Sequence, residues 1–419
     1  MIRLRDSAIS LTGVIFGQGI FFACVTLIGR EQGPAMLGRF NAYLAMGTLA
    51  GTLAVLRYEL ACISDSPAKA FEALLHSILL ALSLGIAAAA ALWMLGLTQY
   101  WVVEVFAFSL LVQNVGSLYL NSLRRYTLIF VCRSIANFVF LVWVWYASLV
   151  NLAYDAFSVY AAIYFFVGTG TLFCILMDGR RNGYTFRLRR GFYVEHARYP
   201  KYLLPSTLLG SVLAYALSIL MPVWYNAEQV GYFAVAYRFG VFPVSLIGQS
   251  IGGVFRRDAV GVAQASTPAA SLQYVFVAYA CGLVVIAVAY ALTVTVLFEP
   301  LVSVLFGAHW SGASATYLHV LTPLFALQII YVPLSQVFLA TKQQRLDFAV
   351  QLLTASALGV TLYAVHKWWL GLTTTLLSFS CVGAVCTLVG IYATSRAAEL
   401  SLRDVRGVFQ LSWIGRRSK

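Results

Sequence analysis

The sequence predicts an all-α, polytopic membrane protein with about twelve transmembrane helices in two six-helix lobes around a central cavity. The chain is 61% hydrophobic and only 10% charged, whereas an ordinary soluble domain carries roughly 25% charged residues. Apolar stretches of about 20 residues, the length that crosses the hydrocarbon core, recur from one end to the other. The polar segments between them are mostly shorter than the ~50 residues that an independent soluble domain needs.

Twelve apolar segments account for most of the chain. They are Ala8–Ile28, Phe40–Leu56, Ala73–Leu97, Trp101–Leu123, Tyr126–Val150, Phe157–Met177, Tyr202–Trp224, Gly231–Val254, Tyr274–Phe298, Tyr317–Ala340, Phe348–Val365 and Leu370–Tyr392. The first segment is preceded by Arg3 and Arg5, as in a signal peptide, but no small-residue cleavage site follows it. We therefore expect an uncleaved first helix.

The basic residues predict the orientation. With both termini in the cytoplasm, the inner segments hold 23 of the 28 Lys and Arg residues, and the outer loops hold only three. Cytoplasmic loops of membrane proteins carry such an excess of positive charge. Because a missed helix would scramble this alternation, the charge pattern favours twelve crossings.

Two lobes are expected because the longest internal gap, Asp178–Lys201, divides the helices six and six. We place the N-terminal lobe at residues 1–200 and the C-terminal lobe at residues 201–419. Weak self-similarity supports this division, since "LGRF" at Leu37–Phe40 and "VGYF" at Val230–Phe233 are 193 residues apart. Six helices per half is an even number, which predicts a parallel repeat about an axis along the membrane normal.

Enzymatic, metal-binding and nucleic-acid functions are disfavoured. The chain has no H-E-x-x-H motif, no P-loop and no Gly-rich dinucleotide fingerprint, and none of its five histidines is at metal-ligand spacing with another. Its seven cysteines form no C-x-x-C pair and fall mostly within apolar runs. The net charge of +13 reports membrane topology rather than nucleic-acid binding. We expect no metal and no cofactor.

Arg238 is the only charged residue in the eighth segment, and an ionisable group inside the bilayer is costly. Ser245, Gln249 and Arg256 follow it at offsets of 7, 11 and 18, which are close to whole helical turns. The four residues are therefore expected to form one polar stripe. Either Arg238 snorkels to the outer interface as an anchor, or the stripe lines a water-filled cavity. A stripe that faced lipid along its whole length would be costly, which favours the cavity.

Arg133, in the fifth segment, is the corresponding cation of the N-terminal half, and Asn137 lies one turn further on. Arg133 either snorkels to the cytoplasmic face or lines the cavity as a second cation. Gln18, between two glycines in the first segment, either packs against a neighbouring helix or joins the lining. Arg30 and Arg39 ring the expected outer mouth, unless they are ordinary loop charges.

Glu104, near the outer end of the fourth segment, is the one candidate for an ion-coupling acid, or else a simple interfacial residue. Cations thus outnumber acids in the expected lining. A cationic cavity without matching acids suits an anionic substrate, and the planar guanidinium of arginine favours phosphate. The residues by themselves therefore predict a two-lobed transporter of an anionic cargo.

Five stretches carry a family resemblance. They are "LRYELA" at Leu56–Ala61, "YPKYLLPSTLLG" at Tyr199–Gly210, "VGYFAVAYRFGVFPVSLIGQSIGGVF" at Val230–Phe255, "LFGAHWSGASATYLHVLTPLF" at Leu305–Phe325 and "VPLSQVFLATKQQ" at Val332–Gln344. In this order they resemble the bacterial O-antigen and exopolysaccharide flippases, the polysaccharide branch of the multidrug/oligosaccharidyl-lipid/polysaccharide exporter superfamily. The resemblance spans most of the chain but does not specify a sugar.

The resemblance implies movement of an undecaprenyl-pyrophosphate-linked oligosaccharide across the bacterial inner membrane, from the cytoplasmic to the periplasmic leaflet. It implies alternating access, H+ or Na+ as the coupling ion, and a polysaccharide polymerase and chain-length regulator as partners besides the lipid bilayer. Arg57 and Glu59 fall in the second-helix motif. With Arg256 they are expected to form a cytoplasmic gate, unless the Arg57–Glu59 pair simply fixes the helix ends.

Two other functions stay open. An ion-coupled multidrug or cation antiporter of the same fold would need a buried carboxylate, and the N-terminal half lacks a convincing one. A membrane enzyme of polysaccharide assembly would need a large outer loop, which the charge-based topology does not give.

Overall fold

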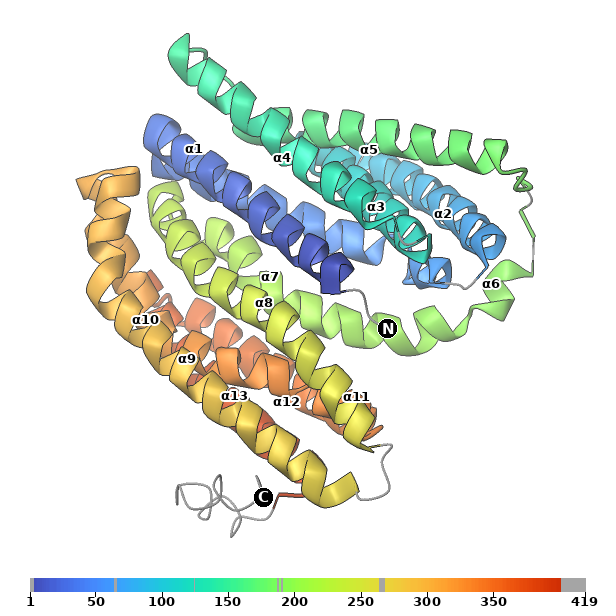
Figure 1. Ribbon diagram of the computed structural model, residues 1–419. Coiled ribbons are helices and arrows are strands. Elements are labelled where there is room, and N and C mark those ends of the chain that lie inside the picture. Colours follow the sequence, from blue (N-terminus) through green and yellow to red (C-terminus); the bar gives the residue numbers. More distant parts are fainter. Residues whose placement is uncertain are drawn as a thin grey trace. The chain divides into compact units, whose positions relative to one another are not determined.

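The structure is a computed structural model that describes residues 4–63, 66–123, 125–186, 188–189, 191–263 and 268–400. Over these residues the chain is predominantly helical and has no strand (Figure 1). The long helices are α1 (Leu4–Leu53), α2 (Pro67–Met94), α3 (Trp101–Ser122), α4 (Tyr126–Leu149), α5 (Ala156–Arg181), α7 (Leu204–Trp224), α8 (Ala227–Ala263), α9 (Pro268–Phe306), α10 (Ala308–Leu334), α12 (Gln344–Lys367) and α13 (Leu372–Ala397). The short helices are η1 (Tyr58–Cys62), η2 (Thr98–Tyr100), α6 (Phe192–Glu195), η3 (Tyr199–Leu203) and α11 (Val337–Ala340).

Within the described residues, ten helices are long and apolar enough to cross a membrane, and the two halves of α1 match the first two expected segments. The halves meet at Gly33, whose backbone (φ 78°, ψ 179°) adopts a conformation open essentially to glycine alone. Pro34 then begins the second half, a position that suits proline because no helical N–H bond is lost there. The prediction of an all-α membrane protein with about twelve crossings is confirmed.

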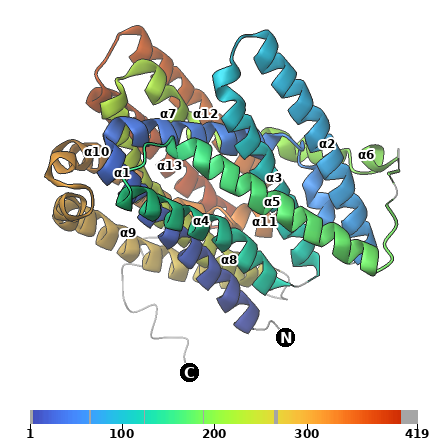
Figure 2. The same ribbon diagram turned by 90° about the horizontal axis from the view of Figure 1, so that it is seen from above.

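The chain divides into two compact units, Met1–Gly231 (unit 1) and Tyr232–Lys419 (unit 2). In unit 1, α1 packs against α3, α4 and α7, while α5 packs against α3 and α4, and α2 packs against α3 (Figures 1 and 2). Aromatic rings fill the space between α1, α3, α4 and α5; they include Phe40, Phe106, Phe140, Phe157 and Tyr160. Because α7 packs against α1, it belongs to unit 1 by its contacts, and the expected lobe boundary after residue 200 stays a prediction.

Residues that were expected on opposite sides of the membrane lie at opposite ends of the helices of unit 1. At one end, Arg125 Nη1 lies 3.1 Å from Asp178 Oδ2. At the other end, Gln32 Nε2 donates a hydrogen bond to the Tyr154 carbonyl at 3.2 Å. Each contact joins two connecting segments that the charge pattern assigned to the same side, which requires an even number of crossings between them. Which end faces the cytoplasm stays a prediction.

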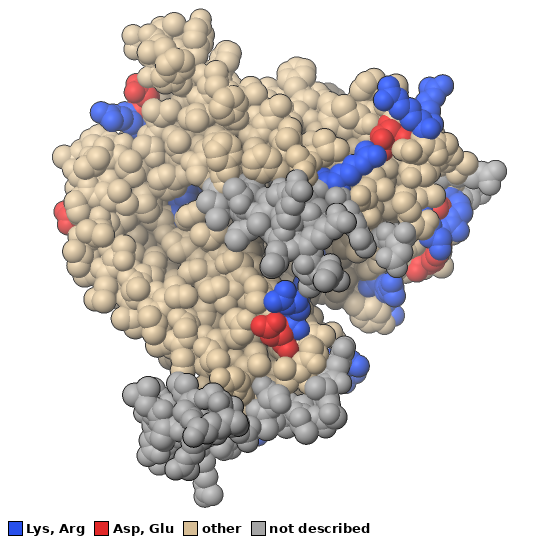
Figure 3. Space-filling model, viewed as in Figure 1, with Lys and Arg blue, Asp and Glu red and all other residues tan. Residues whose placement is uncertain are grey.

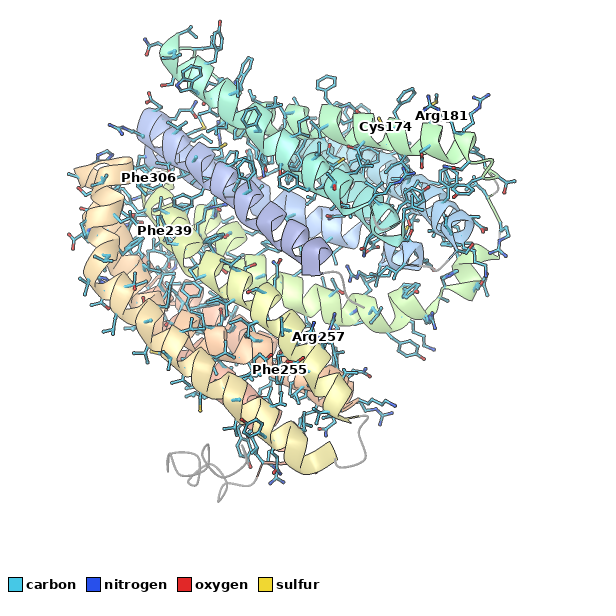
Figure 4. The ribbon with its side chains drawn as sticks, viewed as in Figure 1. Cys174, Arg181, Phe239, Phe255, Arg257 and Phe306 are labelled. Atoms are coloured by element: carbon cyan, nitrogen blue, oxygen red, sulfur yellow. The ribbon has the colours of Figure 1, made fainter. Side chains whose placement is uncertain are left out.

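In unit 2, α10 packs against α9 and α13, and α13 packs against α12. α8 is seated closely on α10, because a β-carbon built on Gly240 would collide with the Phe325 ring. Phe239 of α8, labelled in Figure 4, lies with its ring centroid 5.0 Å from that of Phe298 on α9. Small residues on one face of α8 and aromatic residues on the next thus fix the helix against two neighbours.

Two glycines that match between the expected repeats lie in close contact. Gly38 of "LGRF" and Gly231 of "VGYF" lie against each other, since a β-carbon built on Gly38 would lie 2.9 Å from the Gly231 nitrogen and 3.1 Å from the Ala227 carbonyl oxygen. A β-carbon on Gly231 would collide with the Pro34 carbonyl, and Pro34 is the counterpart of Ala227 at the same spacing of 193 residues. The relation between the two halves stays a prediction.

A second pair of glycines obeys the same spacing. Gly47 and Gly240 are also 193 residues apart. A β-carbon on Gly47 would lie 2.5 Å from the Phe106 ring of α3, and one on Gly240 would collide with the Phe325 ring of α10. Because α3 is the fourth crossing and α10 is the tenth, the two contacts occupy equivalent places in the two halves.

We expect Gly231→Ala to destabilise the protein, because the added β-carbon collides with the Pro34 backbone, and overpacking of this kind costs about 1–3 kcal/mol. Gly253, on the same helix, has no described atom of another element within 4 Å of its built β-carbon. Gly253→Ala is therefore expected to stabilise the helix by about 0.5–1 kcal/mol. Thermal unfolding of both variants in detergent checks this pair, and shifts of the same sign would contradict the close approach.

Candidate functional site

The polar stripe of α8 is the first candidate. Ser245 and Gln249 are exposed in the middle of the helix, and Gln249 Nε2 donates a hydrogen bond to Ser245 Oγ at 3.1 Å. Arg256 is exposed towards the end of α8, whereas Arg238 is half-buried nearer its start. The bond between Ser245 and Gln249 holds the two side chains together on one face, as their offset of four residues predicts.

The side of α8 next to the stripe is closed by packing. β-Carbons built on Gly248 and Gly252 would lie 2.7 Å from a Val332 side-chain atom and 3.3 Å from the Pro333 Cα atom of α10. Ser245 and Gln249 lie beside this contact on the helix surface, and both are nevertheless exposed. Exposed polar groups in the middle of a membrane-spanning helix favour contact with water or with a polar cargo over contact with lipid. Within unit 2, the stripe thus has the character of a wet surface.

Asn137 lies in the core of unit 1. It is 9% exposed, and its Nδ2 atom donates to the Gly17 carbonyl at 3.3 Å. Its Oδ1 atom accepts hydrogen bonds from the hydroxyl groups of Tyr160 and Tyr164 at 3.1 and 3.2 Å. The amide thereby ties α1, α4 and α5 together, so its geometry gives it a packing role, and its expected role in a cavity lining stays a prediction.

Gln18 and Arg133 are the other candidates inside unit 1. Gln18 is exposed on α1, beside the Gly17 that bonds to Asn137. Arg133 lies one turn before Asn137 on α4, and its side chain falls outside the described part of the structure. Both assignments to the lining stay predictions.

Arg30 and Arg39 lie on either side of the Gly33 bend. Arg30 is exposed, and Arg39 Nη2 pairs with Asp155 Oδ1 at 2.8 Å. Burial raises the pKa of the Asp155 carboxyl, but the hydrogen bonds from Ser158 and the charge of Arg39 together outweigh burial and hold that pKa below its ordinary value. The Arg39 side chain is 51% exposed, so the ion pair contributes about 0–1 kcal/mol and leaves Arg39 able to exchange partners.

Glu104 lies in the first turn of α3 and is half-buried. Its carboxylate lies beside α2, because a β-carbon built on Gly85 would come within 3.3 Å of Glu104 Oε1. The absence of a side chain at Gly85 therefore makes room for this acid. Its role in ion coupling stays a prediction.

The Arg57–Glu59 pair of the expected gate has a strained and buried geometry. Leu56 and Arg57 both have left-handed backbone angles (φ 50° and 68°), which are uncommon for residues other than glycine. Arg57 Nη1 lies 3.0 Å from Glu59 Oε1, whereas the buried Glu59 Oε2 atom finds no hydrogen-bond partner among the described residues. Burial raises the pKa of Glu59, and the charge of Arg57 and a backbone hydrogen bond offset only part of this effect.

Arg256 lies towards the C-terminal end of α8, next to a small group of charged residues. The Nε atom of Arg257, a residue labelled in Figure 4, lies 3.4 Å from Asp258 Oδ1. The Tyr279 hydroxyl donates a hydrogen bond to Asp258 Oδ2 at 2.7 Å. Arg256 belongs to unit 2, whereas Arg57 and Glu59 belong to unit 1. A gate formed by all three residues stays a prediction.

Sequence reasoning misses two acids. Asp155 caps α5 by accepting a hydrogen bond from the Ser158 backbone N–H at 2.9 Å, and an Asp followed three residues later by Ser before an apolar run was the available signal. Asp347 lies in the first turn of α12, where its Oδ2 atom accepts a hydrogen bond from Gln351 Nε2 at 3.1 Å. The helix α12 begins at Gln344, four residues before the expected segment Phe348–Val365. Asp347 therefore lies within the helix, although it was outside the expected segment.

We expect Glu59→Gln to stabilise the protein at pH 8 in detergent, as measured by thermal unfolding. The raised pKa of Glu59 means that the fold disfavours the ionised carboxylate, so this carboxylate destabilises the fold above its ordinary pKa of 4.5. The advantage of Gln should therefore shrink as the pH falls towards 4.5. Glu195→Gln, at an exposed site, is the control for the loss of a carboxylate. A pH-independent effect of Glu59→Gln would contradict this reasoning.

Solved structures of transporters share the fold of this chain. No protein-family model and no curated protein matches its sequence. An inward-facing multidrug resistance MATE family transporter of the MOP superfamily aligns over 91% of this chain and 95% of its own, with a TM-score of 0.62 and 16% identity. The lipid II flippase MurJ, in an inward closed conformation, aligns over 100% of this chain and 94% of its own, with a TM-score of 0.62 and 15% identity. An outward-facing MATE transporter aligns over 94% and 95%, also at 0.62, with 17% identity. At these identities the likeness establishes the fold, and the chain is a multi-pass membrane protein with the two-lobed fold of the MATE and MurJ transporters.

Proposed function

We propose that this protein is a flippase for polyprenyl-pyrophosphate-linked oligosaccharide repeat units, such as those of O-antigen or exopolysaccharide. It moves them from the cytoplasmic to the periplasmic leaflet of a bacterial inner membrane by alternating access. The observation that carries the proposal is the stripe of α8, in which Arg238 and Arg256 flank the exposed Ser245 and Gln249.

The chemistry of the stripe fits such a cargo. A guanidinium group binds phosphate oxygens through two parallel hydrogen bonds, which suits a pyrophosphate. The Ser245 hydroxyl and the Gln249 amide add neutral donors and acceptors that match sugar hydroxyl groups. The cationic ends and the neutral middle of one helix face thus correspond to the anionic and sugar parts of one substrate.

Two further observations support the proposal. The five sequence stretches resemble polysaccharide flippases, and one of them contains the whole stripe except Arg256. The protein also shares its fold with MurJ, which is described as a lipid II flippase, so this architecture accommodates lipid cargo. The membrane end that holds the Arg125–Asp178 pair is proposed to face the cytoplasm, together with both termini. A polymerase and a chain-length regulator are the proposed partners.

An ion-coupled multidrug or cation antiporter is the second candidate. It is favoured by the MATE transporters that share the fold and by the half-buried Glu104, which offers a carboxylate to H+ or Na+. Because Glu104 lies in the first turn of α3, any ion bound there would be close to the helix end.

The flippase proposal predicts graded losses at Arg238. Arg238→Lys keeps the charge but loses the fork geometry and should retain partial activity, whereas Arg238→Ala should lose most of it, by about 10- to 100-fold for one lost charged contact of ~1.5–3 kcal/mol. The measurement is complementation of a deletion strain, scored by surface polysaccharide and by accumulation of lipid-linked repeat units. Normal polysaccharide without such accumulation in the deletion strain would refute the proposal. Full activity of Arg238→Ala would make this residue a mere interface anchor.

The antiporter candidate makes a separate prediction at Glu104. If this carboxylate binds the coupling ion, Glu104→Gln should abolish ion-driven uptake into vesicles that contain the purified protein, and it should abolish protection of cells against toxic cations. Asp347→Gln removes a different acid near a helix end and serves as the matched control. Unchanged ion flux in Glu104→Gln would remove this candidate.

A further inference from the structure

The segment that joins α5 to α7 has two unlike sides. Its inner side is docked on unit 1 through Phe192, which is 2% exposed and stacks on the ring of His76 at 4.2 Å. The Arg189 backbone N–H donates to His76 Nε2 at 3.1 Å, and the Tyr193 hydroxyl donates to the His76 carbonyl at 3.2 Å. These contacts hold the segment against the end of α2.

The outer side of the same segment combines cations with exposed apolar side chains. Its exposed basic residues are Arg180, Arg181, Arg189, Arg198 and Lys201. Its large exposed apolar residues include Val194 at 80%, Tyr202 at 66% and Leu188 at 53%. In Figure 3, blue side chains gather over the end of α5 and around α6. We call residues 180–203 the basic connector, of which the structure describes all but residues 187 and 190.

The basic connector is strongly unbalanced in charge. Its sequence holds seven basic residues and one acidic residue, Glu195. Glu195 Oε2 already accepts a hydrogen bond from Arg189 Nη2 at 3.2 Å, so it does not neutralise the other cations. Two of these cations lie beside aromatic rings, with Arg198 Cζ 5.3 Å from the Tyr199 centroid and Lys201 Nζ 5.3 Å from the Tyr202 centroid.

The position of the basic connector indicates which part of the bilayer it contacts. It begins at the last residues of one membrane-spanning helix and ends where the next begins, so it lies at the level of the membrane surface. Large apolar side chains exposed to water would be a liability there. Cations beside apolar and aromatic groups are instead the pattern of segments that lie in the headgroup region, with the apolar groups at the acyl boundary.

We propose that the basic connector is a binding surface for anionic phospholipid headgroups of the surrounding bilayer. Arg181, Arg198 and Lys201 contact the headgroup phosphates, while Val194 and Leu188 enter the boundary between headgroups and acyl chains. Charge complementarity and the placement of the segment carry this inference. It concerns the annular lipid rather than the transported cargo, and it stands whether or not the proposed flippase function is correct.

The test measures binding of short-chain phosphatidylglycerol and phosphatidylcholine to the purified full-length protein by native mass spectrometry. Wild type is expected to prefer phosphatidylglycerol. The triple variant Arg181→Gln/Arg198→Gln/Lys201→Gln should bind it at least about tenfold more weakly, since each surface cation contributes roughly a factor of five. The control Lys342→Gln/Arg345→Gln/Arg396→Gln removes three exposed cations of unit 2 that lie outside the basic connector, and it should weaken binding less than the first triple variant does.

Other variants keep the proposal falsifiable. Val194→Ser/Leu188→Ser should weaken binding of both lipids to a similar degree, because it removes apolar contact and keeps the charges. Single cation variants should give graded losses if the triple variant fails to fold. Equal binding of the two lipids by wild type, equal losses in both triple variants, or full competition by inorganic phosphate would overturn the proposal.

Discussion

The hydrocarbon core of a bilayer offers no hydrogen-bond partner, and most of this structure follows from that constraint. Every crossing segment must satisfy its own backbone groups, so the apolar stretches of the chain become helices. The same constraint makes each polar side chain within a helix informative, because it must find a partner or water. Asn137 finds three partners inside unit 1. Ser245 and Gln249 are hydrogen-bonded to each other and remain exposed, as is expected of a surface that contacts water or cargo.

With the backbone satisfied internally, helices in a bilayer associate through close packing rather than through a hydrophobic driving force. Glycine is the residue that allows helices to approach most closely. In this chain the close contacts occur at glycines spaced 193 residues apart. Gly38 lies against Gly231 and Ala227, and Gly231 lies against Pro34. Gly47 and Gly240 each lie against an aromatic ring of a neighbouring helix. The glycines that match between the two sequence halves therefore stand where close contact leaves no room for a side chain.

The number, order and approximate bounds of the helices were predictable because hydropathy and loop charge act locally along the chain. The bend at Gly33 follows from a local signal too, a glycine before a proline. Partners distant in sequence were not predictable. No pattern in one stretch indicates that Arg39 would pair with Asp155, or that the amide of Asn137 would be used by two tyrosines. Asn137 and Gln249 look alike in the sequence, as polar residues within apolar helices, yet one is buried and one is exposed. Only the packing of neighbouring helices separates these two cases.

Charge alone cannot give a flippase its selectivity. The basic connector and the stripe of α8 both present arginines, and both ordinary phospholipids and a pyrophosphate-linked cargo present phosphate oxygens. A surface cation at the membrane interface therefore discriminates poorly between lipid and cargo. The stripe differs because Ser245 and Gln249 stand between its two cations and offer neutral hydrogen-bonding groups. A site that hydrogen-bonds hydroxyl groups rejects ligands that lack them, since its own polar groups are then left unpaired. On the proposed function, discrimination between cargo and bulk lipid therefore rests on this neutral middle of the stripe, while the arginines supply attraction.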